Sequence, residues 1–70
     1  KTFGEDHPQV AIYRNNLGGA WRAKGEYGKA IEYYEKALSV LSVKLGNEHP
    51  DTKLIETNLS LAKKEKLESK

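Results

Sequence analysis

Apolar residues recur at intervals of three and four along most of this 70-residue chain, which is the spacing of one face of an α-helix. The first stripe comprises Val10, Tyr13, Leu17, Ala20 and Trp21. The second comprises Ala30, Ile31, Tyr34, Ala37, Leu38, Leu41 and Leu45, and the third Ile55, Leu59 and Ala62. No stretch alternates apolar and polar residues as a half-buried strand does. The pattern predicts an all-α fold.

Boundary signals divide the chain into three helical segments. Pro8 and Pro50 suit the first turn of a helix, because proline loses no hydrogen bond there, and the residues before them are able to cap exposed amides. Gly25 and Gly46 suit the left-handed conformation that ends a helix. We therefore expect helices at about residues 8–24, 28–45 and 50–68, with antiparallel neighbours joined by short turns.

A short polar phrase occurs twice, as FGEDHP at residues 3–8 and as LGNEHP at residues 45–50. The histidines at positions 7 and 49 set a period of 42 residues, and matches such as Asn16 with Asn58 continue past the phrase. Such a period is typical of stacked repeats, so a whole structural unit is duplicated. Residues one repeat apart do not converge on one ion. We predict that His7 and His49 cap helices, and we expect no metal site.

The spacing of small and aromatic residues resembles the tetratricopeptide repeat in two consecutive motifs, Arg14-x2-Leu17-Gly18-x2-Trp21 and Gly25-x-Tyr27-x2-Ala30-x3-Tyr34-x2-Ala37. The small residues stand where two antiparallel helices must approach. Arg14 replaces the usual Trp of the pattern, and Ser42 replaces the usual Pro. The longer second helix and the Gly-x-x-His-Pro phrase resemble the kinesin light chain type of the repeat. The resemblance implies an antiparallel helix-turn-helix unit of an α-solenoid.

This resemblance predicts one domain over residues 1–70. Residues 1–7 would lead in from a preceding repeat, and residues 8–45 would form a complete helix pair. Residues 46–70 would form the first helix of the next repeat. Since Lys63 takes the place of Trp21 in this second copy, we expect that helix to act as a C-terminal cap, apolar toward its neighbour and polar outward.

Composition argues against several classes of function. The charge of +2, from 12 basic and 10 acidic residues, is too balanced to predict nucleic acid as a partner, although the lysine-rich tail leaves nucleic acid or membrane as a weaker alternative. The chain has no Cys, and no apolar run approaches the roughly 18–20 residues that span a bilayer. No nucleophile and base grouping is suggested. We expect a cytoplasmic, non-enzymatic protein without a cofactor.

A second stripe beside the predicted core is the candidate binding surface. It comprises Ile12, Asn15, Asn16, Gly19 and Arg22 on the first helix, and Leu54, Thr57, Asn58, Leu61 and Lys64 on the third. The resemblance implies that this concave face holds peptides. Asn side chains donate to and accept from a peptide backbone, and Arg22 and Lys64 attract carboxylates.

Two functions remain open at this stage. The first is a scaffold module that binds a protein or peptide on the concave face, alongside adjacent repeats of a longer chain. The alternative is a repeat that self-associates, as a dimer or by exchange of the third helix, without a dedicated ligand. In addition, Asn16 and Asn58 have an equally good structural interpretation, in which they only link adjacent helices.

Overall fold

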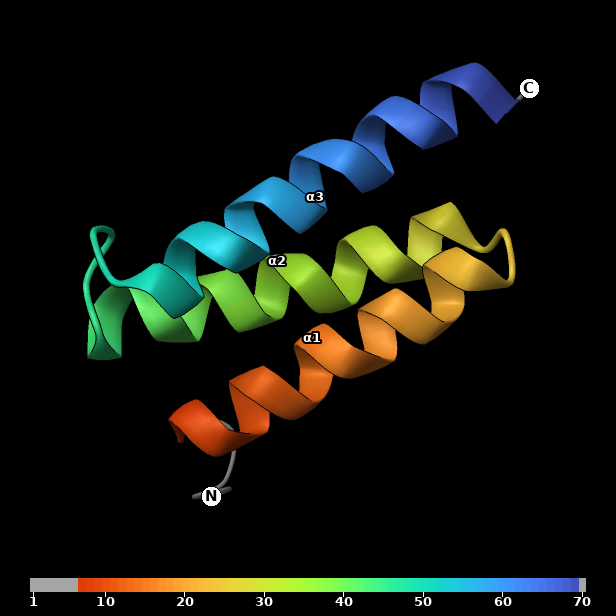
Figure 1. The fold of residues 1–70 in the computed structure, drawn as a ribbon. Helices are drawn as coiled ribbons and strands as arrows, with labels where there is room; N and C mark the ends of the chain where they lie inside the picture. The colour runs from red at the N-terminus through yellow and green to blue at the C-terminus, as the bar shows by residue number, and fades with distance from the viewer. Residues whose placement is uncertain (1–6, 70) are drawn as a thin grey trace.

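The computed structural model describes residues 7–69, which form three α-helices and contain no strand (Figure 1). Helix α1 comprises Pro8–Ala23, α2 Tyr27–Lys44 and α3 Pro50–Ser69. α2 lies in the middle, α1 packs antiparallel to it on one side, and α3 returns on the other side in the direction of α1 (Figure 1). The predicted all-α arrangement is confirmed. Of the expected lead-in, only His7 falls within the described residues.

The two histidines of the repeated phrase cap α1 and α3 in the same way. Nδ1 of His7 accepts the amide hydrogen of Gln9 at 3.1 Å, and Nδ1 of His49 accepts that of Asp51 at 3.1 Å. Each bond satisfies one of the amides that the first turn of a helix leaves without an internal partner. The predicted capping role of both histidines is confirmed, and the proline that follows each one opens its helix.

Glycines end the first two helices. Gly25 and Gly46 have φ angles of +88° and +93°, in the left-handed region that favours glycine. α1 ends one residue earlier than predicted, α2 begins and ends one residue earlier, and α3 continues one residue further. Differences of this size are ordinary at helix ends, where the terminal turn frays. The predicted three-helix division is therefore correct.

The core is built around one face of α2. Its buried residues are Ala11 from α1, Ala30, Tyr34, Ala37 and Leu41 from α2, and Ile55 and Ala62 from α3. Gly18 allows α1 to approach closely, because a Cβ atom at this position would lie 2.7 Å from Cε1 of Tyr34. The small residues predicted at the contact between α1 and α2 are thus required by the packing.

The predicted core stripe of α1 is partly wrong. Tyr13 is 63% exposed and Ala20 is also exposed, whereas Ala11 and Gly18 are buried against α2. The buried face is displaced around the helix by roughly one residue, or about 100°. The reason is that α1 packs mainly on α2, and Tyr13 and Ala20 lie on a side of α1 that is turned away from α2. The same positions in α3, Ile55 and Ala62, are buried.

Candidate partner-binding groove

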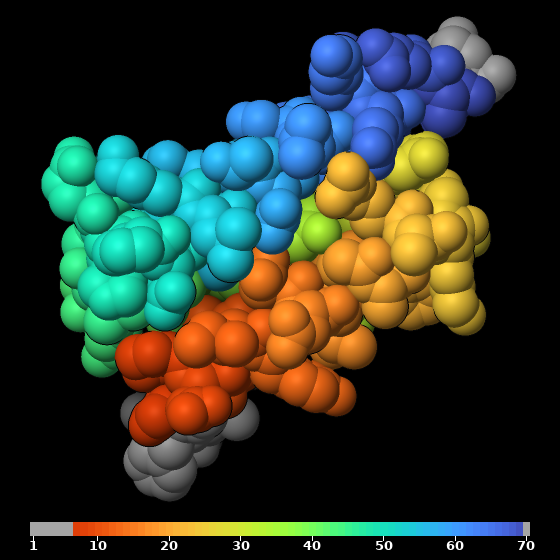
Figure 2. All heavy atoms as spheres, viewed as in Figure 1, coloured from red at the N-terminus to blue at the C-terminus, as the bar shows by residue number. Residues whose placement is uncertain are grey.

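A groove runs between α1 and α3, with atoms of α2 visible at its base (Figure 2). On the α1 side it is lined by Asn15, Gly19 and Arg22, which follow one another at three- and four-residue spacing. Gly19 lies beside α2, since a Cβ atom at this position would be in ordinary van der Waals contact with the hydroxyl of Tyr34, at 3.7 Å. On the α3 side, Asn58 and Glu65 face these residues.

Two hydrogen-bonded links hold α1 and α3 in register across the groove. Asn58 Nδ2 donates to Asn15 Oδ1 at 3.0 Å. Arg22 binds Glu65 through both carboxylate oxygens, with Nε at 2.6 Å and Nη2 at 3.0 Å. Each link joins residues 43 positions apart, and the two links lie seven residues apart, about two helical turns. The polar side chains therefore fix the spacing of the two groove walls.

Three large aliphatic side chains border the same groove and remain open to solvent. Ile12 is 38% exposed, Leu54 is 53% exposed and Leu61 is 40% exposed. Ile12 precedes Asn15 by three residues, and Leu54 and Leu61 stand four before and three after Asn58, so all three share the faces that carry the links. The groove thus combines apolar walls with amide groups that a peptide backbone can use.

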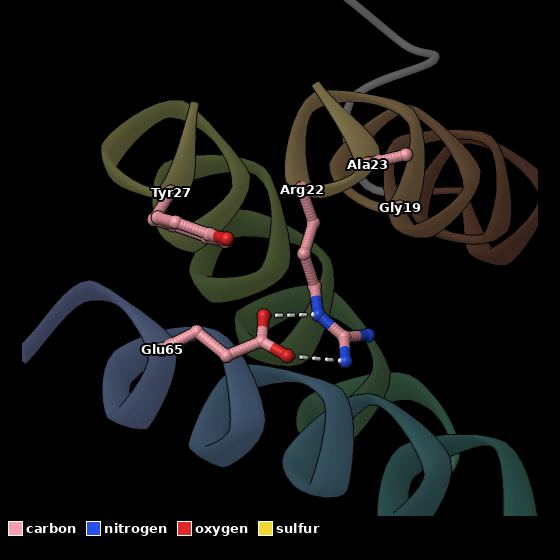
Figure 3. A pocket seen from close by; sticks show the side chains of 5 residues that line it. All are labelled: Gly19, Arg22, Ala23, Tyr27 and Glu65. Carbon is pink, nitrogen blue, oxygen red and sulfur yellow. Dashed lines mark hydrogen bonds and ion pairs between the residues drawn. The ribbon is translucent and has the colours of Figure 1, made fainter. Parts of the chain in front are cut away.

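The end of the groove nearest the α1–α2 turn holds a pocket of about 280 Å³ lined by Gly19, Arg22, Ala23, Tyr27 and Glu65 (Figure 3). The guanidinium of Arg22 reaches across it to the carboxylate of Glu65. The hydrogen bond from Arg22 lowers the pKa of Glu65. The same hydrogen bond raises the pKa of Arg22, and a smaller rise comes from the Tyr34 hydroxyl. Side chains from all three helices therefore meet at this end.

The remaining predicted groove residues take no part in these links. Asn16, Thr57 and Lys64 are exposed, and the hydroxyl of Thr57 donates to the carbonyl of Lys53 within α3. Arg22, which is predicted to attract a partner's carboxylate, donates two hydrogen bonds to Glu65 in this structure.

Glu65 is the residue that sequence reasoning missed. It follows Leu61 by four residues, and Leu61 follows Asn58 by three, so extending the predicted stripe by one turn reaches it. The prediction selected Lys64 instead, because Lys64 stands one period of 42 after Arg22. The repeat period therefore identified the correct face of α3 but not the residue that binds Arg22. Links across the groove join residues 43 positions apart, one more than the period of 42.

Residues 7–69 contain no group of three or more His, Cys, Asp or Glu side chains that could hold a metal ion. None of their helices is long and apolar enough to cross a membrane.

Comparison with known proteins places this arrangement in a family. The model of the tetratricopeptide repeat matches residues 1–42. The chain belongs to the tetratricopeptide repeat family. The family expected from the sequence is therefore confirmed, and the described helices agree with its antiparallel pair followed by a further helix. Members of this family are generally protein–protein interaction modules.

Two proteins have sequences similar to this chain. A mouse (Mus musculus) protein, tetratricopeptide repeat protein 23-like, is 41% identical over 61 residues, which cover 87% of this chain and 13% of the relative. The human clustered mitochondria protein homolog is 41% identical over 39 residues, which cover 56% of this chain and 3% of the relative. The chain thus matches only a small part of either relative's length. No solved structure gave a significant match.

Proposed function

We propose that this repeat binds a peptide or a segment of a partner protein in the groove between α1 and α3, as a non-catalytic scaffold module. The observation that carries the proposal is the exposure of Ile12, Leu54 and Leu61 along one groove, at 38–53% of each residue's surface. Aliphatic side chains gathered on one surface are typical of interaction sites, because a partner that covers them removes apolar area from water. Family membership supports the same function.

The test uses a library of extended peptides and follows binding by fluorescence anisotropy. Leu54→Asn and Leu61→Asn are expected to weaken the selected peptides about tenfold each, since each variant loses part of a buried leucine contact in the complex. Leu67→Asn is the matched control, because Leu67 lies on the same helix, is 77% exposed and stands off the groove stripe. Equal losses for all three variants, or none, would contradict binding in the groove.

A second candidate function is self-association through the uncovered face of α1. Tyr13 on this face is 63% exposed, whereas the equivalent Ile55 of α3 is 1% exposed and packs against α2. A second copy of the chain is able to cover this face directly. Alternatively, two chains exchange their α3 helices when the turn at Gly46 straightens. The association buries a face of α1 that residues 7–69 leave exposed.

Sedimentation equilibrium distinguishes this candidate from peptide binding. We expect dimers or larger species at high protein concentration and a melting temperature that falls on dilution. Tyr13→Lys should shift the equilibrium to monomer without changing peptide binding. Leu54→Asn should weaken peptide binding without changing the equilibrium between monomer and dimer. A folded monomer at millimolar concentration, with a melting temperature independent of concentration, excludes self-association.

The cytoplasmic location expected from the sequence remains a prediction. So does the expectation of neither cofactor nor catalysis, although tetratricopeptide repeats are typically non-catalytic scaffolds.

A further inference from the structure

The ion pair of Arg22 and Glu65 forms one end of the groove and stays accessible from it. The two side chains are 30% and 35% exposed, and the pocket of about 280 Å³ lies directly against them. Figure 3 shows the guanidinium entering this pocket from α1 and the carboxylate entering from α3. A functional group of a bound peptide is therefore able to reach the guanidinium without unfolding the helices.

Lysines flank this pair in the chain. Lys64 is exposed and precedes Glu65 on α3. The ammonium groups of Lys24 and Lys29 lie 5.7 Å and 5.1 Å from the ring centre of Trp21, next to Arg22 in the chain. Glu65 is the carboxylate that the structure pairs with Arg22. Arg22 is the cation among the residues that line the pocket, and its guanidinium is the group that an anionic side chain of a partner is able to contact.

When one carboxylate replaces another on Arg22, the guanidinium is paired with a negative charge both before and after the exchange. The guanidinium keeps its charge at any ordinary pH and prefers two parallel hydrogen bonds to a carboxylate. Glu65 lies at the rim of the groove and, once released, is able to turn into water. The bound and free states then hold the same kind of ion pair. The free energy of binding therefore depends on the contacts that the rest of the peptide makes.

We infer that Glu65 holds the place of a partner's carboxylate, and that an acidic side chain of a bound peptide displaces it from Arg22. The inference rests on the proposed function, since it assigns a ligand class to the same groove. The partner is an extended peptide with a Glu side chain at this end of the groove and an apolar side chain against Leu61. Glu65 is therefore a specificity-determining residue, which acts as a competitor inside the chain.

Helix geometry sets the spacing of the two recognised side chains. Leu61 and Glu65 are four residues apart on α3, which corresponds to about 6 Å along the helix. In an extended peptide, alternate residues point to the same side and lie roughly 6.6 Å apart. The peptide should therefore carry its apolar residue and its Glu two positions apart, in the order that matches its direction in the groove.

Capped octapeptides that contain Leu-Ser-Glu or Glu-Ser-Leu test this inference, each beside a version with Gln in place of Glu. Binding to the 15N-labelled protein is followed by NMR titration, which measures weak affinities. We expect Glu65→Gln to tighten the better Glu peptide about two- to fivefold, the scale of a partly exposed ion pair, and to leave its Gln version unchanged. Glu68→Gln removes an exposed charge from the same helix and is the control.

The wild-type protein supplies an independent readout if Glu65→Gln disturbs the fold. The Nε–H signal of Arg22, which is hydrogen-bonded to Glu65 in the free protein, should shift with the Glu peptide and not with the Gln peptide. Equal affinity for both peptides in wild type and Glu65→Gln overturns the exchange while groove binding stands. Failure of these peptides, together with failure of the library to yield any groove-dependent binder, overturns both proposals.

Discussion

Helices α1 and α3 are equivalent copies at a period of 42 residues, yet the faces that they bury differ. In α3, Ile55 and Ala62 are 1% and 0% exposed where they pack on α2. Their counterparts in α1, Tyr13 and Ala20, are exposed. The comparison shows that the neighbour, rather than the local pattern of apolar residues, decides which face of a repeated helix becomes core.

On a second face of the two helices, the residues of α1 are buried and their counterparts in α3 are exposed. Ala11 and Gly18 of α1 are buried against α2, whereas their counterparts in α3, Lys53 and Ser60, are exposed. The outer face of α3 has thus acquired polar residues, which suits the predicted role as a cap. The uncovered face of α1 still carries Tyr13, which is 63% exposed. The asymmetry favours self-association or a preceding repeat at α1 over any further contact at α3.

The comparison is tested most strongly by truncating equivalent positions. Ile55→Ala should lower the free energy of unfolding by about 2–5 kcal/mol, because it opens a cavity in a closely packed core. Tyr13→Ala should change it by about 0.5 kcal/mol or less in the monomer, since the ring is mostly in water. Urea denaturation followed by circular dichroism measures both. Similar losses would mean that α1 and α3 are packed alike.

A second test adds volume at equivalent positions. Gly18→Val should destabilise the protein by about 1–3 kcal/mol, because the new side chain meets the buried ring of Tyr34. Ser60→Val introduces the same β-branched residue at the exposed counterpart and serves as the control. Thermal melting should separate the two variants clearly. Equal melting temperatures would show that α1 does not approach α2 as closely as the structure indicates.

The link between Asn15 and Asn58 tests whether α1 and α3 are coupled across the groove. A double-mutant cycle of Asn15→Ala and Asn58→Ala should give a coupling free energy of about 0.5–1.5 kcal/mol, the net contribution of one hydrogen bond. Asn16→Ala, at an exposed position, should show no coupling with Asn58→Ala. Strictly additive losses from the first pair would mean that the groove walls are independent in solution.

The smallest expected effect is a dependence of stability on acidic pH. Hydrogen bonds from Arg22 lower the pKa of Glu65 below its ordinary value of 4.5. The unfolded chain therefore takes up this proton more readily, so the stabilisation is complete above about pH 4.5 and is lost as the pH falls through the lower, folded-state pKa. Glu65→Gln should flatten this part of the melting-temperature profile, and Glu68→Gln should not. An unchanged profile for Glu65→Gln would contradict the pair.

Local signals in the sequence determined the helices and their ends. The His-Pro phrases, the two left-handed glycines and the apolar spacing act within one or two turns, so they predicted three helices to within one residue. The duplication predicted that α1 and α3 are equivalent. The motifs that resemble the tetratricopeptide repeat placed Gly18, Ala30 and Ala37 at the helix contacts, because close approach excludes larger side chains.

Only the tertiary structure decided which side chains meet across the groove and which apolar side chains the described residues leave exposed. The selection of Glu65 as the partner of Arg22, and of Asn15 as the partner of Asn58, depends on how α1 and α3 are displaced along α2. Likewise, Tyr13 belongs to a sequence stripe that predicts burial, but α2 contacts the neighbouring Ala11 and Gly18 face instead. Contacts between helices far apart in the chain depend on their rotation and register, which periodicity within one helix does not specify.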